Sequence, residues 1–373
     1  MSLSIKVQEI LNLIVFSKKI FSKPKKKDIL IFDSDLSDYI LHYLDKDKVH
    51  VLDNRYKQRV GQKINIFIII KMILKFKLSS YEYFKTYLSY ISPKLILTLI
   101  DNNKTFYKLK EMYPLAKVML IQNAWRTADF NDIFKDLDLL RKSKLKCDLI
   151  LSYNKHVGEK FKTFLHGEIM PIGSFRSNFN LKKNLNKKYD FLYISIFRDP
   201  NCMFDTHFKL LKTMNEYFSS KKEKLYVLGS LGTTPNKEKL FYDKYLKDTD
   251  YVFIPRGKKR PTYDIVDQSN IILTVESTLG YEAFARGNKV AYFSIRKDSY
   301  PDNTAKFGWP ANKEDNGPFW VNSTDLITFK KIINFLENIN QNEYSKILKD
   351  HTSDLIEYDE GNKKFNEIVN KII

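Results

Sequence analysis

The stretch from residue 275 to 294, VESTLGYEAFARGNKVAYFS, constrains the fold more than any other part of this chain. An apolar, β-branched run over 271–275 is followed by three polar residues and then by a helix-favouring segment, 279–286. Gly287 stands where the cap at the end of a helix is expected, and 289–293 begins a second strand-like run. The order strand, turn, helix, glycine, strand predicts a βαβ unit of a parallel sheet.

Two hydroxyl residues, Ser277 and Thr278, stand at the first turn of this predicted helix. One interpretation is an ordinary helix cap, in which side-chain oxygens accept hydrogen bonds from free backbone N–H groups. The other is an anion site, because open α/β sheets bind nucleotide phosphates where helices begin at the carboxyl ends of their strands. The segment by itself leaves both interpretations open.

Strand-like runs and amphipathic stretches of helix length alternate along most of the chain. This alternation is typical of parallel sheets with helices on both faces, so the sequence predicts an α/β fold. The predicted strands cover 28–32, 50–52, 95–100, 117–121, 149–152, 191–196, 224–228, 251–254, 271–275 and 290–293.

A polar segment rich in lysine and asparagine separates these strand-like runs into two sets of similar size. We therefore predict a Rossmann-like domain over 1–178, a linker over 179–188, a second Rossmann-like domain over 189–350 and a C-terminal helix over 351–373 that packs back. Two doubly wound domains that face a central cleft form a GT-B-like architecture.

The formal net charge is +19, yet only two cysteines occur in 373 residues. So few cysteines fit a reducing compartment, and we expect a cytoplasmic protein. Six histidines show no metal-ligand spacing, so no metal is predicted. The positive charge favours attraction to anionic lipid headgroups or phosphorylated substrates. Nucleic acid is not expected as a partner, because the charges are spread along the chain and no nucleic-acid-binding module is recognisable.

The most apolar segment, 64–78, is too short and too rich in lysine for a transmembrane helix, which needs ~20 apolar residues. Our preferred interpretation is a buried helix of the first domain. The alternative is a surface patch that dips into the inner leaflet of the cytoplasmic membrane, near a lipid-linked acceptor. The N-terminal residues lack the small-residue cleavage site of a signal peptide.

Several short motifs occur in both predicted domains. In the second half they are VESTLGYEAFARG at 275–287, KFGWP at 306–310 and NGPFW at 316–320; in the first half they are LIDNNKTFY at 99–107, IQNAWR at 121–126 and PIGSFRSN at 171–178. Together they resemble a family of bacterial surface carbohydrate biosynthesis proteins that are built like GT-B enzymes. The resemblance implies that the first domain binds an acceptor and the second a nucleotide-activated sugar.

More distantly, the layout is similar to bacterial sialyltransferases and capsular Kdo transferases, which use CMP-activated nonulosonic or ulosonic acids. Those families commonly carry a His-Pro pair in the donor domain, followed by a Ser/Thr pair. Here the Ser-Thr pair stands at 277–278, whereas the corresponding strand end, 253–256, reads FIPR and lacks the histidine.

The resemblance implies a glycosyltransferase of capsule, lipopolysaccharide or O-antigen biosynthesis. Its donor would be a CMP-activated nonulosonic or Kdo-like acid, and its acceptor a glycan or a lipid-linked glycan, with no cofactor and no metal. One alternative is a CDP-alditol phosphotransferase of the teichoic-acid type. A second is a non-catalytic protein that binds nucleotides or nucleic acid.

Candidate donor-binding residues cluster after the predicted strands of the second half. The hydroxyls at 277–278 and the helix start would neutralise a leaving phosphate, and arginines match phosphate or carboxylate bidentately. The basic loop 257–260 is equally typical of a solvated loop. For Glu282, which would accept from ribose hydroxyls, an exposed helix position is the competing interpretation. The candidates are Ser277, Thr278, Glu276, Gly280, Glu282, Arg256, Lys258, Arg260 and Arg198.

For the catalytic base we predict Asp101, with Asp33 as a competitor, because each follows a predicted strand of the acceptor domain. Asp101 begins an Asp-Asn-Asn turn, so a helix cap is an equal alternative. Amide and aromatic side chains after the strand at 117–121 form a plausible sugar-binding set, and a loop packed by its tryptophan is the alternative. The acceptor candidates are Asn102, Asn103, Gln122, Asn123, Trp125 and Arg126.

Overall fold

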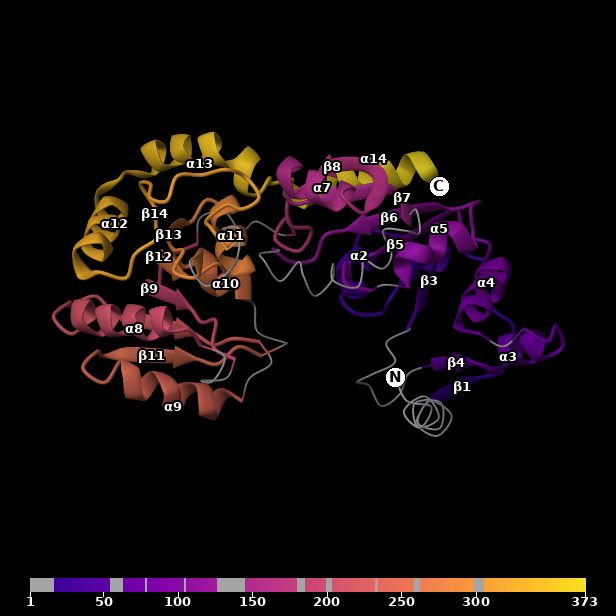
Figure 1. The fold of residues 1–373 in the computed structure, drawn as a ribbon, viewed down its shortest axis with the longest axis horizontal. Coiled ribbons are helices and arrows are strands. Elements are labelled where there is room, and N and C mark those ends of the chain that lie inside the picture. Colours follow the sequence, from indigo (N-terminus) through magenta and orange to yellow (C-terminus); the bar gives the residue numbers. More distant parts are fainter. Residues whose placement is uncertain are drawn as a thin grey trace.

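The computed structural model describes residues 17–53, 63–77, 79–103, 105–125, 145–179, 185–198, 203–231, 234–257, 262–297 and 305–373. Two six-stranded parallel sheets lie side by side, one in the N-terminal half and one in the C-terminal half (Figure 1). The α/β, GT-B-like prediction is confirmed, with two doubly wound layers of helix, sheet and helix.

The first sheet has the strand order β3-β2-β5-β6-β7-β8. Alternate residues of β2 face opposite sides: Leu30 and Phe32 pack with α4, whereas Ile29 and Ile31 pack with α14. A strand covered on both faces reads as a continuous apolar run, as this one does. The strands are β2 (Ile29–Phe32), β3 (Val49–Leu52), β5 (Leu95–Thr98), β6 (Lys117–Ile121), β7 (Leu145–Ser152) and β8 (Leu165–Pro171).

Short helices and one small sheet surround the first sheet. The small sheet consists of β1 (Lys18–Ile20) and β4 (Lys63–Asn65), which pair in parallel. The helical segments are α2 (Ser37–Leu41), η1 (Lys46–Lys48), α3 (Ile66–Ile73), α4 (Ser80–Ile91), η2 (Phe106–Lys108), α5 (Leu109–Met112) and α7 (Lys155–Lys162).

The second sheet has the strand order β11-β10-β9-β12-β13-β14, which corresponds to the 3-2-1-4-5-6 order of a Rossmann fold. Its strands are β9 (Tyr189–Ile194), β10 (Leu225–Leu228), β11 (Tyr251–Ile254), β12 (Ser269–Thr274), β13 (Lys289–Phe293) and β14 (Trp320–Val321). Its helices are α8 (Asp205–Phe218), α9 (Pro235–Tyr245), α10 (Thr262–Asp267), α11 (Thr278–Ala285), α12 (Leu326–Asn338) and α13 (Gln341–Leu355).

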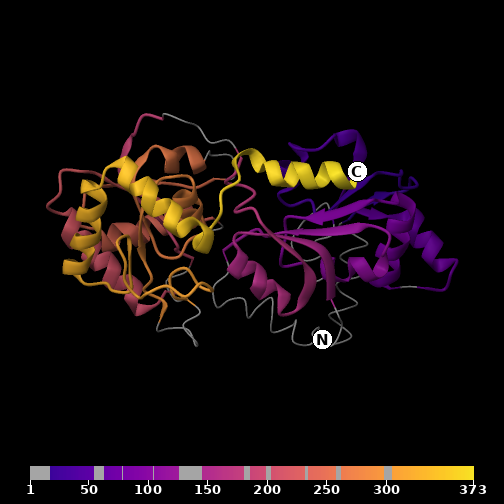
Figure 2. The ribbon, with the colours of Figure 1, turned by 90° about the horizontal axis from the view of Figure 1, so that it is seen from above.

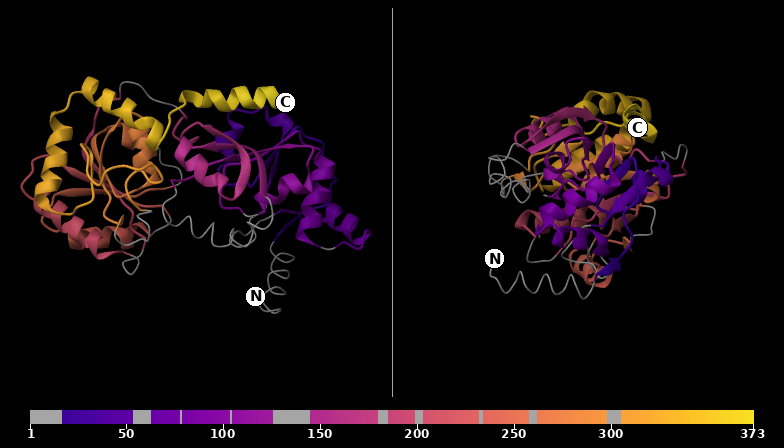
Figure 3. Two further views of the ribbon diagram at one scale, coloured as in Figure 1. Left: turned by 45° about the horizontal axis from the view of Figure 1, so that its top comes forward. Right: turned by 90° about the vertical axis from the view of Figure 1, so that its right-hand side faces the viewer.

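After α13 the chain returns to the N-terminal half, where η6 (Glu360–Asn362) and α14 (Lys363–Ile372) lie over the first sheet (Figures 2 and 3). Phe365 and Val369 of α14 join the apolar cluster beneath β2. The returning segment passes so close to Gly173 that a Cβ there would stand 1.8 Å from the carbonyl oxygen of Glu357, and Gly173 has φ 74°. Only glycine fits both the close approach and this backbone conformation.

The prediction that 64–78 forms a buried helix is wrong for the outward-facing side of that helix. The segment forms β4 and the eight-residue helix α3, of which Ile68 and Met72 are buried. Ile70, Ile73 and the following Leu74 are 50%, 51% and 67% exposed. Because α3 packs on α4 and β1 through one side only, its outer face meets solvent. Of the helices in the described ranges, none has both the length and the hydropathy that a bilayer crossing needs.

Candidate functional site

A cavity of roughly 590 Å³ lies where the two halves meet. In a doubly wound sheet the chain reverses its winding direction at one point, and ligands bind at the carboxyl ends of the strands there. In the second sheet this switch point lies between β9 and β12. Ser195, which follows β9, and Glu276 and Ser277, which follow β12, line the cavity. The fold therefore places this cavity at the position where a Rossmann-type sheet binds its ligand.

Four arginines line the cavity: Arg176 from the N-terminal half, and Arg198, Arg256 and Arg296 from the C-terminal half. The last three follow the strands β9, β11 and β13, so parallel topology brings their side chains to one rim. The Nε atom of Arg256 is buried without a hydrogen-bond partner, and burial lowers the pKa of its guanidinium, with Arg176 adding to this effect and Glu282 opposing it. A half-buried guanidinium with an unused donor favours an anionic ligand.

Glu276 is a buried carboxylate on the same wall, and its backbone has φ 53°. Its Oε1 atom accepts a hydrogen bond from Ser294 at 2.9 Å, whereas its Oε2 atom has no partner. Burial raises the pKa of the Glu276 carboxyl to about 7, although Arg296 and Ser294 act in the opposite direction. The carboxyl can therefore take up or give off a proton close to neutral pH.

His207 of α8 lies behind Arg296, at 3.3 Å between His207 Nε2 and Arg296 Nε. Its Nδ1 atom accepts a hydrogen bond from the Phe204 backbone N–H, which fixes the ring. Burial, together with the nearby Arg296, lowers the pKa of His207 to about 4. The imidazole is therefore neutral at physiological pH, with a single acceptor nitrogen for the two N–H groups of Phe204 and Arg296.

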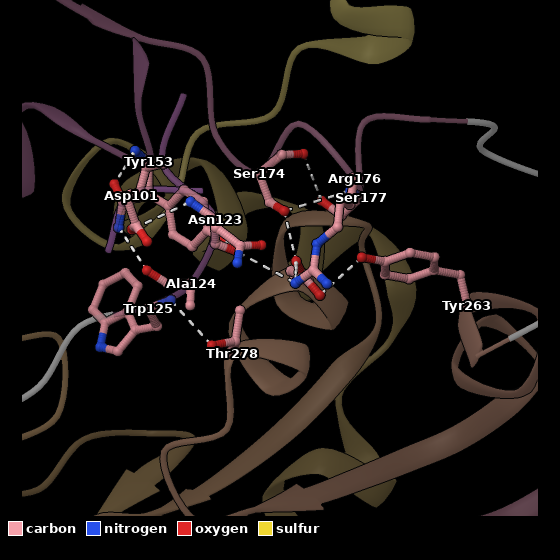
Figure 4. A network of polar contacts seen from close by, with 12 residues as sticks. Asp101, Asn123, Ala124, Trp125, Tyr153, Ser174, Arg176, Ser177, Tyr263 and Thr278 are labelled. Atoms are coloured by element: carbon pink, nitrogen blue, oxygen red, sulfur yellow. Dashed lines mark hydrogen bonds and ion pairs between the residues drawn. The ribbon is translucent and has the colours of Figure 1, made fainter. Parts of the chain in front are cut away.

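Glu282 of α11 joins the two halves rather than standing exposed on its helix, as the competing interpretation had it. It is 2% exposed and accepts hydrogen bonds from Ser174 Oγ at 2.6 Å and from Tyr263 OH at 2.9 Å. Arg176 Nη2 lies 3.4 Å from the same carboxylate and 3.3 Å from the carbonyl oxygen of Asn123 (Figure 4). A carboxylate held by three donors from both halves acts as a clamp across the cleft.

The loop after β6 supplies a second contact between the halves. The backbone N–H of Trp125 donates to Thr278 Oγ1 at 3.0 Å, and the Trp125 ring stacks on Tyr281 with 3.8 Å between ring centroids. Asn123 and Trp125 line the cavity, and the Oδ1 atom of Asn123 and the Nε1 atom of Trp125 have no partner. Thr278 thus uses its oxygen on the neighbouring half, and Ser277 makes no side-chain cap hydrogen bond. The simple helix-cap interpretation of this pair is wrong.

The predicted bases, Asp101 and Asp33, are not among the residues that line this cavity, although they follow β5 and β2 at the switch point of the first sheet. Asp101 is 0% exposed, and its Oδ2 atom accepts from the Asn123 N–H at 3.4 Å. Asp33 is 1% exposed and accepts from the Asp35 N–H at 3.0 Å. Asp33 thus holds a local turn, whereas Asp101 bonds to the loop after β6, and the catalytic role of both stays a prediction.

Other predicted residues also lie away from the cavity wall. Gln122 is buried and bonds to the backbone of Ala124 and Tyr153, which shapes the loop. Asn102 is exposed, and Asn103 accepts from the Thr105 N–H in a turn. A Cβ at Gly280 would stand 2.6 Å from the Thr274 side chain, so this glycine serves helix–strand packing. Lys258, Arg260 and Arg126 lie outside the residues that the structure describes.

Sequence reasoning missed Arg176, Arg296 and His207. The first stands in the PIGSFRSN motif at 171–178 and the second follows a predicted strand, so position alone was a usable signal for both. His207 carried no such signal, because it sits in the first turn of α8 and reaches the site only through Arg296. Within the described ranges, no group of three or more His, Cys, Asp or Glu side chains is arranged to hold a metal ion.

Solved structures of three proteins share this fold over nearly the whole chain. The wall teichoic acid polymerase TagF, as an H444N variant soaked with CDPG, aligns with a TM-score of 0.55 at 12% identity, over 98% of this chain and 96% of its own. HepE from Anabaena, in complex with UDP and glucose, gives 0.53 at 8% identity, over 92% and 99%. UDP-GlcNAc 2-epimerase from Neisseria meningitidis, bound to UDP-GlcNAc, gives 0.51 at 11% identity, over 92% and 98%.

At such low identity these likenesses establish the fold alone. No curated protein matches the sequence. A protein-family model described as "putative O-antigen biosynthesis protein" matches residues 119–373, which include the cavity wall of the C-terminal half and most of the contacts between the halves. With this match over more than half of its length, the chain belongs to that family of O-antigen biosynthesis proteins.

Proposed function

We propose that this protein is a glycosyltransferase that transfers a sugar from a nucleotide-activated donor to a growing surface polysaccharide. One observation carries the proposal: the switch-point cavity of the second sheet is lined by four arginines and lies against the N-terminal half. Such a cavity suits an anionic donor held by one half and an acceptor presented by the other. The family membership supports the polysaccharide as the product.

For the donor we propose a CMP-activated nonulosonic or Kdo-like acid. This class carries a phosphate and a sugar carboxylate, so it offers two anionic groups to the guanidinium groups. The described lining contains four arginines against the two carboxylates of Glu276 and Glu282, which leaves a positive balance. A positive balance supports a doubly anionic ligand over a neutral one.

The reaction needs a base for the acceptor hydroxyl. As the acceptor oxygen attacks the anomeric carbon, the glycosidic bond forms, the bond from that carbon to the phosphate oxygen breaks, and the nucleotide leaves with the electron pair. The acceptor proton passes to the base. We propose Glu276 for this role ahead of Asp101, because Glu276 lines the cavity and has an unpartnered oxygen. Arginine side chains would neutralise the leaving phosphate, without a need for a metal ion.

The first test is a thermal-shift screen of the purified protein against CMP, CDP, UDP, GDP and dTDP. A ligand at ~100 times its dissociation constant adds about 2.7 kcal/mol to the stability of the native state. A selective rise with CMP is the expected result. Selectivity for UDP, GDP or dTDP would retain the enzyme class and replace the donor. No response to any nucleotide would count against the enzyme.

Turnover assays then separate the candidate bases. With the identified donor, Glu276→Gln is expected to abolish transfer and to retain nucleotide binding. Loss of transfer in Asp101→Asn, with transfer retained in Glu276→Gln, would show that Asp101 of the N-terminal half is the base. Transfer that persists in excess EDTA is expected for a metal-independent enzyme, and its loss would contradict that part of the proposal.

A CDP-alditol phosphotransferase is the second candidate, and the fold shared with the wall teichoic acid polymerase TagF is the observation that favours it. A rise in melting temperature with CDP but little with CMP, and a product with a new phosphodiester, would select this function. If neither product forms, the protein is assigned as one that binds nucleotides without turnover.

A further inference from the structure

One part of the surface combines exposed apolar side chains with a dense and uniform positive charge. It consists of residues 17–27 and 63–77, which include β1, β4 and α3, and is called the α3 surface below. Six lysines occur in 17–27 and four in 63–77, with no Asp or Glu in either segment. The nearest acidic residue beyond 77 is Glu82, in the first turn of α4. The α3 surface lies at the outer end of the N-terminal half, away from the C-terminal half (Figure 1).

Three of the exposed apolar side chains lie on one side of a helix. Ile70, Ile73 and Leu74 lie on the same side of α3 because they are three and four positions apart, and Phe76, 96% exposed, follows them. Five of the ten large hydrophobic side chains that are exposed in the described ranges lie on the α3 surface, the fifth being Phe21. The others are scattered, and single exposed hydrophobics are ordinary. Exposed apolar side chains that gather in one patch indicate an interaction site.

Contacts of the neighbouring residues place Phe21 beside this helix. β1 and β4 pair from Lys18–Lys63 to Ile20–Asn65, so the residue after β1 adjoins the start of α3. The side chain of Asn65 donates to the carbonyl oxygen of Ser22 at 3.1 Å, which fixes the segment after β1. Lys23 Nζ lies 5.4 Å from the Tyr90 ring, which in turn contacts Phe67 of α3. Lys23, and Lys71 with its Nζ atom 5.5 Å from the Phe67 ring, therefore share one surface with the apolar face.

The helix is held in place from below. Ile68 and Met72, on its inner face, belong to the same apolar cluster as Phe84 and Leu88 of α4. At 1.5 Å per residue an eight-residue helix is only about 12 Å long, so α3 cannot span a bilayer but can lie in its interface. The exposed face is thus presented rigidly, without a rearrangement before contact.

We propose that the α3 surface docks the protein on a bilayer of anionic phospholipids. Phe21, Ile70, Ile73, Leu74 and Phe76 would enter the headgroup boundary, and the surrounding lysines would pair with lipid phosphates. A second copy of the chain fits less well, because ten lysines without acidic residues would face one another across a symmetric contact. The docking surface lies outside the cavity. Docking therefore goes beyond the proposed sugar transfer and does not depend on it.

Vesicle co-sedimentation tests this proposal. The full-length protein is mixed with vesicles of phosphatidylcholine alone or of phosphatidylcholine with phosphatidylglycerol, at low and high salt. Binding is expected only to the anionic vesicles and is expected to weaken at high salt, since surface charges are screened. Equal binding to neutral vesicles, or no binding to either, would overturn the proposal.

Two variants separate the apolar and the charged contributions. Leu74→Ser with Phe76→Ser removes apolar contact, and Lys71→Gln with Lys75→Gln and Lys77→Gln removes three charges. The triple variant is expected to lose roughly a hundred-fold in affinity for anionic vesicles, at the usual contribution of a lysine near such a surface. The matched controls, Leu115→Ser and Ile327→Ser, alter residues that are 85% and 83% exposed elsewhere and are expected to bind like wild type.

The same variants are also examined by light scattering, for oligonucleotide binding and in the nucleotide thermal-shift screen. An apolar-patch variant that turns a dimer into a monomer, with vesicle binding unchanged, would assign the surface to self-association. Loss of oligonucleotide binding with vesicle binding unchanged would assign it to nucleic acid. Either result overturns the proposal. Nucleotide-dependent shifts equal to wild type show that the cavity is intact, so failure of docking is distinguishable from failure of the proposed sugar transfer.

Discussion

The two sheets use the same topological position in different ways. At the switch point of the first sheet stand Asp33 and Asp101, both buried and both bonded to backbone N–H groups. At the switch point of the second sheet stands Glu276, also buried, with one oxygen unpartnered on a cavity wall. A carboxylate at a strand end is therefore not by itself a site. The second position differs because one oxygen of its carboxylate makes no hydrogen bond within the protein.

The largest effect is expected at the clamp between the halves. Glu282→Ala would leave the Arg176 guanidinium in the cleft without its carboxylate, and breaking a buried ion pair in this way costs about 3 kcal/mol or more. Chemical denaturation measures the loss. Glu367→Ala, on the exposed side of α14, is the matched control. A variant as stable as wild type that has lost nucleotide binding would show that Glu282 is a ligand residue and not a clamp.

A second prediction concerns the pH dependence of stability and tests the unused carboxyl at the second switch point. The pKa of Glu276 is raised by burial to about 7, from an ordinary value of 4.5. Between these two values the native state holds a proton that the unfolded state has released, so the contribution to stability falls as the pH rises and levels off above pH 7. Glu276→Gln, which stays neutral, should match wild type below pH 4.5 and exceed it by up to about 3 kcal/mol at alkaline pH.

Denaturant titrations across this pH range measure the difference between the two proteins. Arg296 and Ser294 face the carboxyl and lower its pKa, and His207 lies behind Arg296. Because His207 is present in both proteins, its titration cancels in the comparison. Glu216→Gln, on the exposed face of α8, is the control. A constant difference at every pH would contradict a buried, titrating Glu276.

The third prediction tests whether the cavity wall of the C-terminal half binds the nucleotide. Arg256→Ala should weaken nucleotide binding about tenfold to a hundredfold, since a hydrogen bond to a charged group contributes roughly 1.5–3 kcal/mol. Isothermal titration calorimetry with the nucleotide selected by the thermal-shift screen measures this. Lys349→Ala, an exposed change of the same charge on α13, should bind like wild type. Equal loss in both would mean that only the overall charge matters.

The smallest effect is expected at the first switch point. Asp101→Asn weakens the hydrogen bond from the Asn123 N–H, and a net loss of about 1 kcal/mol in stability is expected with nucleotide binding unchanged. Thermal denaturation and calorimetry give the two quantities, with Asp350→Asn at an exposed position of α13 as control. If nucleotide binding falls as far as in Arg256→Ala, the difference between the two switch points disappears.

Sequence periodicity determined the elements and the fold class. Parallel strands buried on both faces read as short apolar runs, as β5 and β12 do, so ten of the twelve strands of the two large sheets were predicted in their order along the chain. The edge strands β8 and β14, and the small sheet of β1 and β4, were not predicted. The βαβ pattern around Ser277 likewise located the cavity wall correctly, because the residues after a parallel strand always lie at its carboxyl end. Exposure of α3 was not readable, since an apolar run looks the same whether one face or both are covered.

Only the tertiary structure decided which polar residues are free for a ligand. Asp101 is the third residue after β5 and Glu276 the second after β12, but Asp101 meets the Asn123 N–H from the neighbouring loop, whereas one oxygen of Glu276 meets no donor. Arg176 and Glu282, 106 residues apart, come together only because the two halves close on each other. Hydrogen bonds between distant segments carry no local sequence signal, and it is these bonds that separate a structural carboxylate from a functional one.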